Sequence, residues 1–232
     1  MQNNIDIIIP IYNERYNILK LILNFRTKLK FNHTILLCYD NQDKNFIFYR
    51  KILNNFKNIK LIQNQGNGPC EAVKTGLNIS KSEYKIIFPC DDRSNFDVLN
   101  KIKKLSISKY DVIVPSRFMK GGSMKNCPII KSIIVRFVSK SLHFLKIIPV
   151  EDASNGFRFF SKKFLNKVSI ESKVGFAYSL ELLIKSKIMK KKIKQIPAKW
   201  EERTSGKSNF KILNWGIVYL KWYLYGILNF NK

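Results

Sequence analysis

The first half of the chain alternates short apolar runs, rich in β-branched residues, with segments whose apolar residues recur at helical spacing. Ile5 to Ile11 is the first such run, and the segment after it carries apolar residues at positions 18, 21, 22 and 25. The runs predict strands at 5–11, 34–39, 59–62, 84–88 and 111–115. The spacing predicts helices at 14–30, 44–56, 70–80 and 96–106. Because strands that alternate with helices usually pair in parallel, we expect an α/β fold with a Rossmann-like, mostly parallel sheet and flanking helices.

The second half of the chain predicts helices at 128–146 and 177–189 and extended segments at 157–160 and 193–196. Its last stretch, Ile212 to Leu228, is apolar apart from Asn214 and Lys221 and contains two tryptophans and three tyrosines. Such a composition is typical of a helix in a membrane interface, although a helix packed against the sheet can share it. Seventeen residues reach ~26 Å as a helix, less than the ~30 Å of a hydrocarbon core, which argues against a spanning helix. We expect the α/β domain to cover residues 1–209 and a C-terminal amphipathic helix, a candidate interface anchor, to cover 210–232.

The charge of the chain is strongly basic and unevenly distributed. It has 232 residues, with 42 Lys and Arg against 16 Asp and Glu. Residues 1–100 carry 14 basic and nine acidic side chains, whereas residues 101–232 carry 28 and seven. No acidic residue lies between Asp111 and Glu151, where seven basic residues occur. The resulting net charge of +26 attracts phosphorylated ligands, nucleic acid or an anionic membrane surface.

The composition also narrows the partners and the compartment. No RNA-recognition or helix-turn-helix pattern supports nucleic acid, so the lysine run at 185–194 is expected to face solvent or anionic lipid. The four cysteines form no CxxC pair and no cluster with histidine, which fits a reduced compartment. Neither a signal peptide nor an uninterrupted run of 18 apolar residues is found. We therefore expect a cytoplasmic protein, peripheral on the inner face of the membrane.

Polar residues follow each predicted strand of the first half. Ligands of such sheets bind at the carboxyl ends of the strands. These ends carry residues 10–14, 40–43, 66–68, 91–92 and 116–117. Each segment alone is compatible with ordinary loop chemistry, but together they describe a polar rim suited to a nucleotide.

Several fragments of the sequence resemble one enzyme family. Ile9-Pro10-Ile11-Tyr12-Asn13-Glu14 resembles the opening of the family 2 glycosyltransferases, which have the GT-A fold. Further fragments are similar, in the same order, to the polyprenyl-phosphate branch of that family, the dolichol-phosphate mannose synthase type. They are Tyr39 to Asp43, Gly66-Asn67-Gly68, Asp91, Ser116-Arg117-Phe118 with Gly121-Gly122, Asp152 with Asn155-Gly156-Phe157-Arg158, Gly175-Phe176 with Glu181, and Pro197 with Arg203, Gly206 and Ser208. The resemblance covers about residues 5–210.

This resemblance implies an inverting transfer of a hexose from a nucleotide sugar, of the GDP-mannose or UDP-glucose type, to a polyprenyl phosphate. It also implies a set of nucleotide-sugar-binding residues: Pro10, Tyr12, Glu14, Asp40, Gly68, Asp91, Asp92 and Arg203. The catalytic residues expected from it are Asp91, Arg117 and Asp152.

A divalent metal, Mg²⁺ or Mn²⁺, is the cofactor that the resemblance implies, with Asp91 as its ligand. The family commonly has Asp-x-Asp at the end of the fourth strand, but Pro89 replaces the first Asp here. One or two carboxylates together with diphosphate oxygens still suit a hard cation. Arg93 could instead supply part of the positive charge, and a capping role at the next helix is the structural alternative for Asp91 or Asp92.

The acceptor determines which further groups the site needs. A lipid phosphate is already ionised at neutral pH and needs a basic pocket, for which Ser116, Arg117, Lys131 and Arg158 are the candidates. A saccharide hydroxyl, as in cell-surface polysaccharide synthesis, needs a general base, for which Asp152 is the candidate. A salt bridge to Arg117 or Arg158 is the structural alternative for Asp152. A basic module that binds lipid or RNA without catalysis is the third hypothesis.

Overall fold

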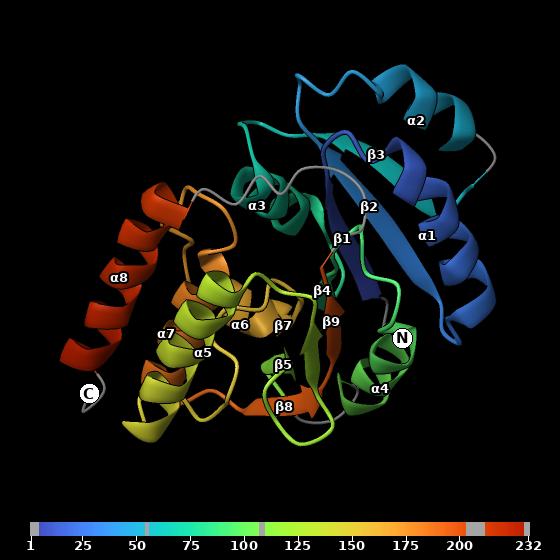
Figure 1. Ribbon diagram of the computed structural model, residues 1–232. Coiled ribbons are helices and arrows are strands. Elements are labelled where there is room, and N and C mark those ends of the chain that lie inside the picture. The colour runs from blue at the N-terminus through green and yellow to red at the C-terminus, as the bar shows by residue number, and fades with distance from the viewer. Residues whose placement is uncertain (1–4, 54–55, 107–109, 203–211, 230–232) are drawn as a thin grey trace.

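The larger of two sheets in the described residues has seven strands. The computed structural model describes residues 5–53, 56–106, 110–202 and 212–229. The strands are β1 (Ile5–Ile11), β2 (His33–Tyr39), β3 (Ile59–Gln63), β4 (Tyr84–Ile87), β5 (Val112–Ser116), β7 (Arg158–Ser161) and β8 (Ile193–Pro197), in the order β3-β2-β1-β4-β7-β5-β8. All neighbours pair in parallel except β7, which runs antiparallel to β4 and β5 (Figure 1). The predicted α/β fold with a mostly parallel sheet is confirmed.

Helices cover both faces of this sheet. One face carries α1 (Arg15–Lys28), α2 (Phe46–Leu53) and α4 (Phe96–Ser106). The other face carries α3 (Pro69–Ile79), α5 (Ile129–Phe144), the short α6 (Lys162–Leu165), α7 (Tyr178–Ile188) and α8 (Ile212–Asn229). Successive side chains of β1 enter the two cores in turn, Ile7 and Ile9 on one face and Ile8 on the other. Burial on both faces explains why the central strands read as continuous apolar runs.

The structure adds elements that the sequence pattern did not predict. β6 (Ser123–Lys125) and β9 (Lys199–Glu201) form a separate two-stranded parallel sheet. Three residues are too few for a periodic signal, so neither strand could be recognised. The sequence pattern also does not show that β7 runs antiparallel to its neighbours, and this direction decides where Arg158 lies. Because β7 is antiparallel, its first residue, Arg158, pairs with Ile87 at the carboxyl end of β4.

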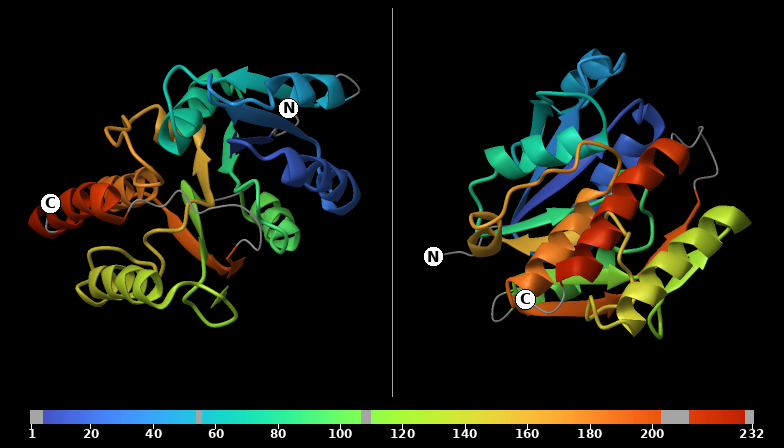
Figure 2. Two further views of the ribbon diagram at one scale, coloured as in Figure 1. Left: turned by 45° about the horizontal axis from the view of Figure 1, so that its top comes forward. Right: turned by 90° about the vertical axis from the view of Figure 1, so that its left-hand side faces the viewer.

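The C-terminal helix α8 packs on the domain through its aromatic residues. Trp222 is 1% exposed, and its indole nitrogen donates a hydrogen bond to the Ser172 hydroxyl at 2.9 Å. Trp215 packs so closely on Gly175 that a Cβ there would lie 2.6 Å from the indole ring. The outward side of the helix carries aliphatic residues instead: Ile217, Leu220, Leu224 and Leu228. The two remaining views show the helix lying along the flank of the molecule (Figure 2).

The aromatic residues of α8 serve mainly to pack the helix on the domain. All except the exposed Tyr225 are at least partly buried. No helix within the described residues combines the length and hydrophobicity that crossing a membrane requires. The expected domain boundary at residue 209 lies outside the described residues.

Trp222→Ala should therefore lower the free energy of unfolding by about 3–5 kcal/mol, because it opens a cavity in the core and leaves the Ser172 hydroxyl without its donor. Urea unfolding followed by circular dichroism measures the change. Leu220→Ala, at a position 55% exposed on the same helix, is the matched control and should change stability by less than about 0.5 kcal/mol. Equal effects would show that α8 is not part of the core.

Candidate active site

The loop after β1 presents Tyr12 at the carboxyl edge of the sheet. Tyr12 is 42% exposed, and the next residue, Asn13, has a left-handed backbone with φ 56°. Asp43 holds this turn, since its Oδ2 accepts hydrogen bonds from the Asn13 backbone at 2.9 Å and from the Tyr49 hydroxyl at 3.2 Å. Glu14 is buried at the start of α1, and its carboxylate accepts a hydrogen bond from Asn17.

Asp40 joins the end of β2 to the glycine loop before α3. Its carboxylate accepts hydrogen bonds from the backbone N–H of Gly68 at 2.9 Å and from the side-chain amide of Asn64. Gly68 has φ 87°, a conformation that favours glycine, and directly precedes α3. Pro10 pairs with Cys38 and Ile11 with Tyr39, so the ends of β1 and β2 lie side by side. The structure therefore brings Pro10, Tyr12, Asp40 and Gly68 to one edge of the sheet.

The two carboxylates after β4 have different surroundings. Asp92 accepts hydrogen bonds from the backbone N–H groups of Ser94 at 2.9 Å and Asn95 at 3.0 Å, just before α4 begins. Asn95 in turn donates to the carbonyl of Lys199 at 2.6 Å, which ties this loop to β9. Burial raises the pKa of Asp92, against the opposing effect of these hydrogen bonds. These bonds hold the loop before α4 but do not cap the helix, whose first turn is closed by the hydrogen bond from the Leu99 N–H to the Asn95 carbonyl at 3.1 Å.

Asp91 remains the candidate metal ligand. No group of three His, Cys, Asp or Glu side chains within the described residues could hold a metal ion by itself. A Mg²⁺ ion commonly takes one or two protein carboxylates and completes its shell with phosphate oxygens and water. One half-buried carboxylate at the carboxyl end of β4 fits an ion that arrives with a diphosphate.

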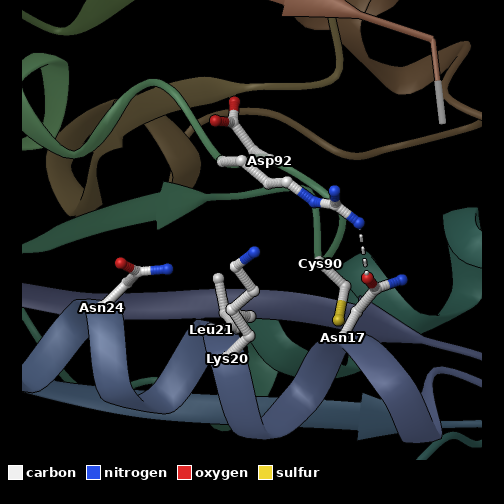
Figure 3. Close-up of a pocket in the computed structure, with 7 residues that line it drawn as sticks. Asn17, Lys20, Leu21, Asn24, Cys90 and Asp92 are labelled. Atoms are coloured by element: carbon white, nitrogen blue, oxygen red, sulfur yellow. Dashed lines mark hydrogen bonds between the residues drawn. The ribbon is translucent and has the colours of Figure 1, made fainter. Parts of the chain in front are cut away.

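A shallow pocket lies beside this loop, on the side of α1 (Figure 3). The pocket is lined by two groups of residues: Asn17, Lys20, Leu21 and Asn24 of α1, and Cys90, Asp92 and Arg93 of the loop after β4. The guanidinium of Arg93 donates a long hydrogen bond, 3.4 Å, to the side-chain oxygen of Asn17. In this structure Arg93 therefore contacts α1.

Asp152 is the centre of a buried network at the end of β5. It has no exposed surface, and its Oδ2 accepts hydrogen bonds from the Arg117 backbone at 2.9 Å and from Arg117 Nε at 2.8 Å. Its Oδ1 accepts from Arg117 Nη2 at 2.9 Å and from the backbone N–H groups of Ser154 and Asn155. Burial alone would raise the pKa of Asp152, but the charge and hydrogen bonds of Arg117 hold this pKa below its ordinary value. The structure thus contains the salt bridge that was the alternative to a general-base role.

Two of the predicted acceptor residues lie beneath the surface. Arg158 has no exposed surface and donates hydrogen bonds to the backbone carbonyls of Asp152 at 2.9 Å and Phe157 at 3.3 Å. Burial lowers the pKa of Arg158 to about 10. Ser116 is also fully buried, and its hydroxyl accepts from the backbone N–H groups of Phe118 and Met119. Both residues shape the loops around Arg117.

A cationic cluster nevertheless forms where β5 meets α5. The guanidinium groups of Arg117 and Arg136 lie over the Phe118 ring, 5.0 and 4.8 Å from its centre. Lys131 Nζ lies 3.0 Å from Glu202 Oε2 and 5.0 Å from the centre of the Trp200 ring. We call Arg117, Lys131 and Arg136 the β5–α5 cationic cluster.

Two further residues of this region are set in place by the fold. Arg136 lies on α5, and the fold sets it across Phe118 from Arg117. Tyr219 of α8 forms a side-chain hydrogen bond with Ser179 and is close enough to Arg117 and Arg158 for their charges to act on its pKa, which burial nonetheless raises. Arg203, predicted to neutralise the diphosphate, lies outside the described residues.

Comparison with known proteins identifies the family. Residues 6–169 match glycosyl transferase family 2, and the chain belongs to this family. It is 25% identical over 228 residues to a dolichol-phosphate mannosyltransferase of Pyrococcus furiosus, a match that covers 94% of this chain and 64% of the relative. The chain thus spans less than two thirds of that relative's length.

Solved structures show the same fold. Glucosyl-3-phosphoglycerate synthase of Mycobacterium tuberculosis, crystallised with Mn²⁺, UDP and phosphoglyceric acid, superposes with a TM-score of 0.69 at 13% identity, over 98% of this chain and 78% of the other. The same enzyme with Mg²⁺ and UDP gives 0.66 at 11% identity, over 98% and 79%. These matches confirm the expected GT-A architecture.

Asp152→Asn should lower the free energy of unfolding at neutral pH by about 3–5 kcal/mol, because it leaves the Arg117 charge buried without its partner. The pKa of Asp152 is lower in the folded than in the unfolded state, whose ordinary value is 3.8. The wild-type advantage is therefore fully present above this pH and is lost as pH falls through the folded pKa.

Urea unfolding of both proteins across acidic pH measures this difference. Asp97→Asn, an exposed carboxylate of α4, is the control and should cost less than about 1 kcal/mol. A constant difference between wild type and Asp152→Asn down to strongly acidic pH would contradict the buried ion pair.

Proposed function

We propose that this chain is an inverting glycosyltransferase that moves a hexose from a nucleotide sugar to a polyprenyl phosphate. The observation that carries the proposal is the β5–α5 cationic cluster, which lies in a stretch without any acidic residue between Asp111 and Glu151. The similarity to a protein named dolichol-phosphate mannosyltransferase supports a lipid phosphate acceptor. The resemblance to enzymes crystallised with UDP supports a nucleotide-linked donor.

The donor binds at the carboxyl edge of β1, β2 and β4. The exposed ring of Tyr12 offers a surface for a nucleotide base, and Pro10, Glu14, Asp40 and Gly68 form the loops beside it. A bound Mg²⁺ or Mn²⁺ would be held by Asp91 and the donor diphosphate, and would offset negative charge on the leaving group. Asp92 keeps the loop that carries Asp91 in place through its hydrogen bonds to Ser94 and Asn95.

The acceptor phosphate binds at the cationic cluster. Arg117 and Arg136 orient its oxygens, and Asp152 positions Arg117 through two side-chain hydrogen bonds. One phosphate oxygen, already ionised, forms a bond to the anomeric carbon while the bond from that carbon to the nucleoside diphosphate breaks. A single displacement inverts the anomeric centre, and no proton has to be removed from the acceptor.

The alternative acceptor, a saccharide hydroxyl, would require a general base. Asp152 was the candidate, but its carboxylate is closed to solvent and accepts five hydrogen bonds in this structure. This geometry favours a positioning role for Asp152 and therefore the phosphate acceptor.

The location proposed for the enzyme is the cytoplasmic face of a membrane, as a peripheral protein. The exposed aliphatic side of α8 and the excess of basic residues in the second half support it.

The direct test incubates the purified chain with radiolabelled GDP-mannose or UDP-glucose and with undecaprenyl or dolichyl phosphate. We expect label in the organic phase that depends on the lipid phosphate. Label that passes only to a water-soluble saccharide would favour the hydroxyl acceptor, and absence of turnover with any donor would favour a binding module.

Arg136→Gln should raise KM for lipid phosphate roughly tenfold to 150-fold, with little change in KM for the nucleotide sugar. The physical reason is the loss of a charge-assisted hydrogen bond to one substrate only. Steady-state kinetics with each substrate varied in turn measures this split. Arg50→Gln, an exposed arginine on the distant α2, is the control. Equal changes in both KM values would assign Arg136 a structural role.

Asp91→Asn should reduce turnover by about 100-fold or more while the chain stays folded, because the leaving diphosphate loses its metal ligand. Glu83→Gln, a carboxylate 65% exposed before β4, should leave turnover unchanged. Because Asp91 is expected to act with the diphosphate, calorimetry should detect tight Mn²⁺ binding only when nucleotide is present. Full activity of Asp91→Asn, or tight Mn²⁺ binding without nucleotide, would remove this assignment.

A further inference from the structure

Exposed apolar side chains gather on two helices of the molecule. Of 18 exposed large apolar side chains in the described residues, 12 belong to α5, to the residue after it, or to α8. On α5 they are Ile129, Ile130, Ile133, Ile134, Phe137 and Phe144, followed by Leu145, with exposures between 45% and 85%. Their spacing places them on one side of the helix, opposite the buried Ser139 and Leu142. Among the described residues, none buries this side of α5.

The outward sides of α5 and α8 adjoin. The Tyr223 hydroxyl of α8 donates a hydrogen bond to the Ser141 hydroxyl of α5 at 3.1 Å, so the two helices are in contact. Figures 1 and 2 show both helices on the same flank of the molecule, outside α7. The aliphatic residues Ile217, Leu220, Leu224 and Leu228 therefore extend the apolar side of α5. We call these residues of α5 and α8 the apolar flank.

The charges around the apolar flank decide what can cover it. The segment from 112 to 150, which includes α5, has seven basic residues and no acidic residue. Lys131 is paired with Glu202, and Lys221 of α8 with Glu171, but Lys140 and Lys146 are exposed cations in this acid-free segment. A second copy of this chain would bring these cations face to face across a two-fold axis. An anionic bilayer offers hydrocarbon for the aliphatic side chains and negative headgroups for Lys140 and its neighbours.

We propose that the apolar flank inserts into the headgroup and upper acyl region of an anionic bilayer, with α5 as the principal inserting element. This inference deepens the proposed function, because the same helix carries Arg136 of the cationic cluster. Insertion of α5 places that cluster at the depth of lipid phosphates, so an acceptor need not leave the membrane to reach Arg117.

The test uses the full chain with Ile133→Ser and Phe137→Ser combined. Both side chains are exposed, 62% and 69%, so the fold should be retained, which circular dichroism verifies. Co-sedimentation with vesicles of phosphatidylcholine and phosphatidylglycerol in equal amounts should show binding reduced by about tenfold or more. The matched control combines Leu23→Ser and Ile47→Ser, which are 59% and 78% exposed on α1 and α2, and should bind like wild type. Phe144→Ser, at an 85% exposed position, is a milder second variant that should weaken binding in the same direction.

Further readouts separate this inference from the proposed function. Transfer to a short-chain, water-soluble polyprenyl phosphate should be unchanged in the α5 variant, whereas transfer to acceptor embedded in vesicles should fall with binding. If the proposed function is wrong and no lipid phosphate is an acceptor, wild type shows no transfer in either assay. The α5 variant still binds vesicles more weakly than wild type in that case. Unchanged vesicle binding by the α5 variant would overturn the inference. The inference would also be overturned if light scattering showed that wild type is a dimer without lipid and the α5 variant is a monomer.

Discussion

The buried ion pair between Arg117 and Asp152 is the interaction on which the acceptor half of the molecule depends. Asp152 has no exposed surface and Arg117 only 9%, so neither charge could be tolerated without the other. The pair joins the carboxyl end of β5 to the loop that enters the antiparallel β7, 35 residues later. Arg158 supports that loop from below through the Asp152 carbonyl. The buried Arg117 is thereby fixed against the Phe118 ring, across which it meets Arg136.

The two flanking helices connect this site to the surface of the molecule. α8 uses its aromatic residues to pack on the domain and leaves its aliphatic residues outside, and α5 exposes a larger apolar side beside it. Arg136 sits on α5, and Tyr219 of α8 lies close to Arg117 and Arg158. The elements that face the proposed bilayer are thus the same ones that complete the acceptor site. If these helices insert as proposed, the largely buried cationic site lies beside the lipid headgroups, and a lipid phosphate reaches it without leaving the membrane.

Much of the fold could be predicted from the sequence because its signals are local. Continuous apolar runs indicated the five strands before residue 116, and the ordered fragments of the family placed Asp40, Gly68 and Asp91 at their carboxyl ends. The remaining features depend on contacts between distant residues. Nothing local shows that Arg158 and Ser116 face inward or that Arg136 stands beside Arg117. Apolar residues lie on every side of α8, so hydrophobicity alone could not tell which side packs on Gly175 and Ser172.

The central claim is that Arg117 and Asp152 act as one unit, and a double-mutant cycle tests it most directly. The cycle compares the free energy of unfolding of wild type, Arg117→Met, Asp152→Asn and the double variant at neutral pH. Each single change leaves one buried group without its ion-pair partner, whereas the double change removes both members of the pair. We expect the loss of unfolding free energy in the double variant to be smaller than the two single losses added together, by at least about 1.5 kcal/mol. Losses that add to within about 0.5 kcal/mol would contradict the account.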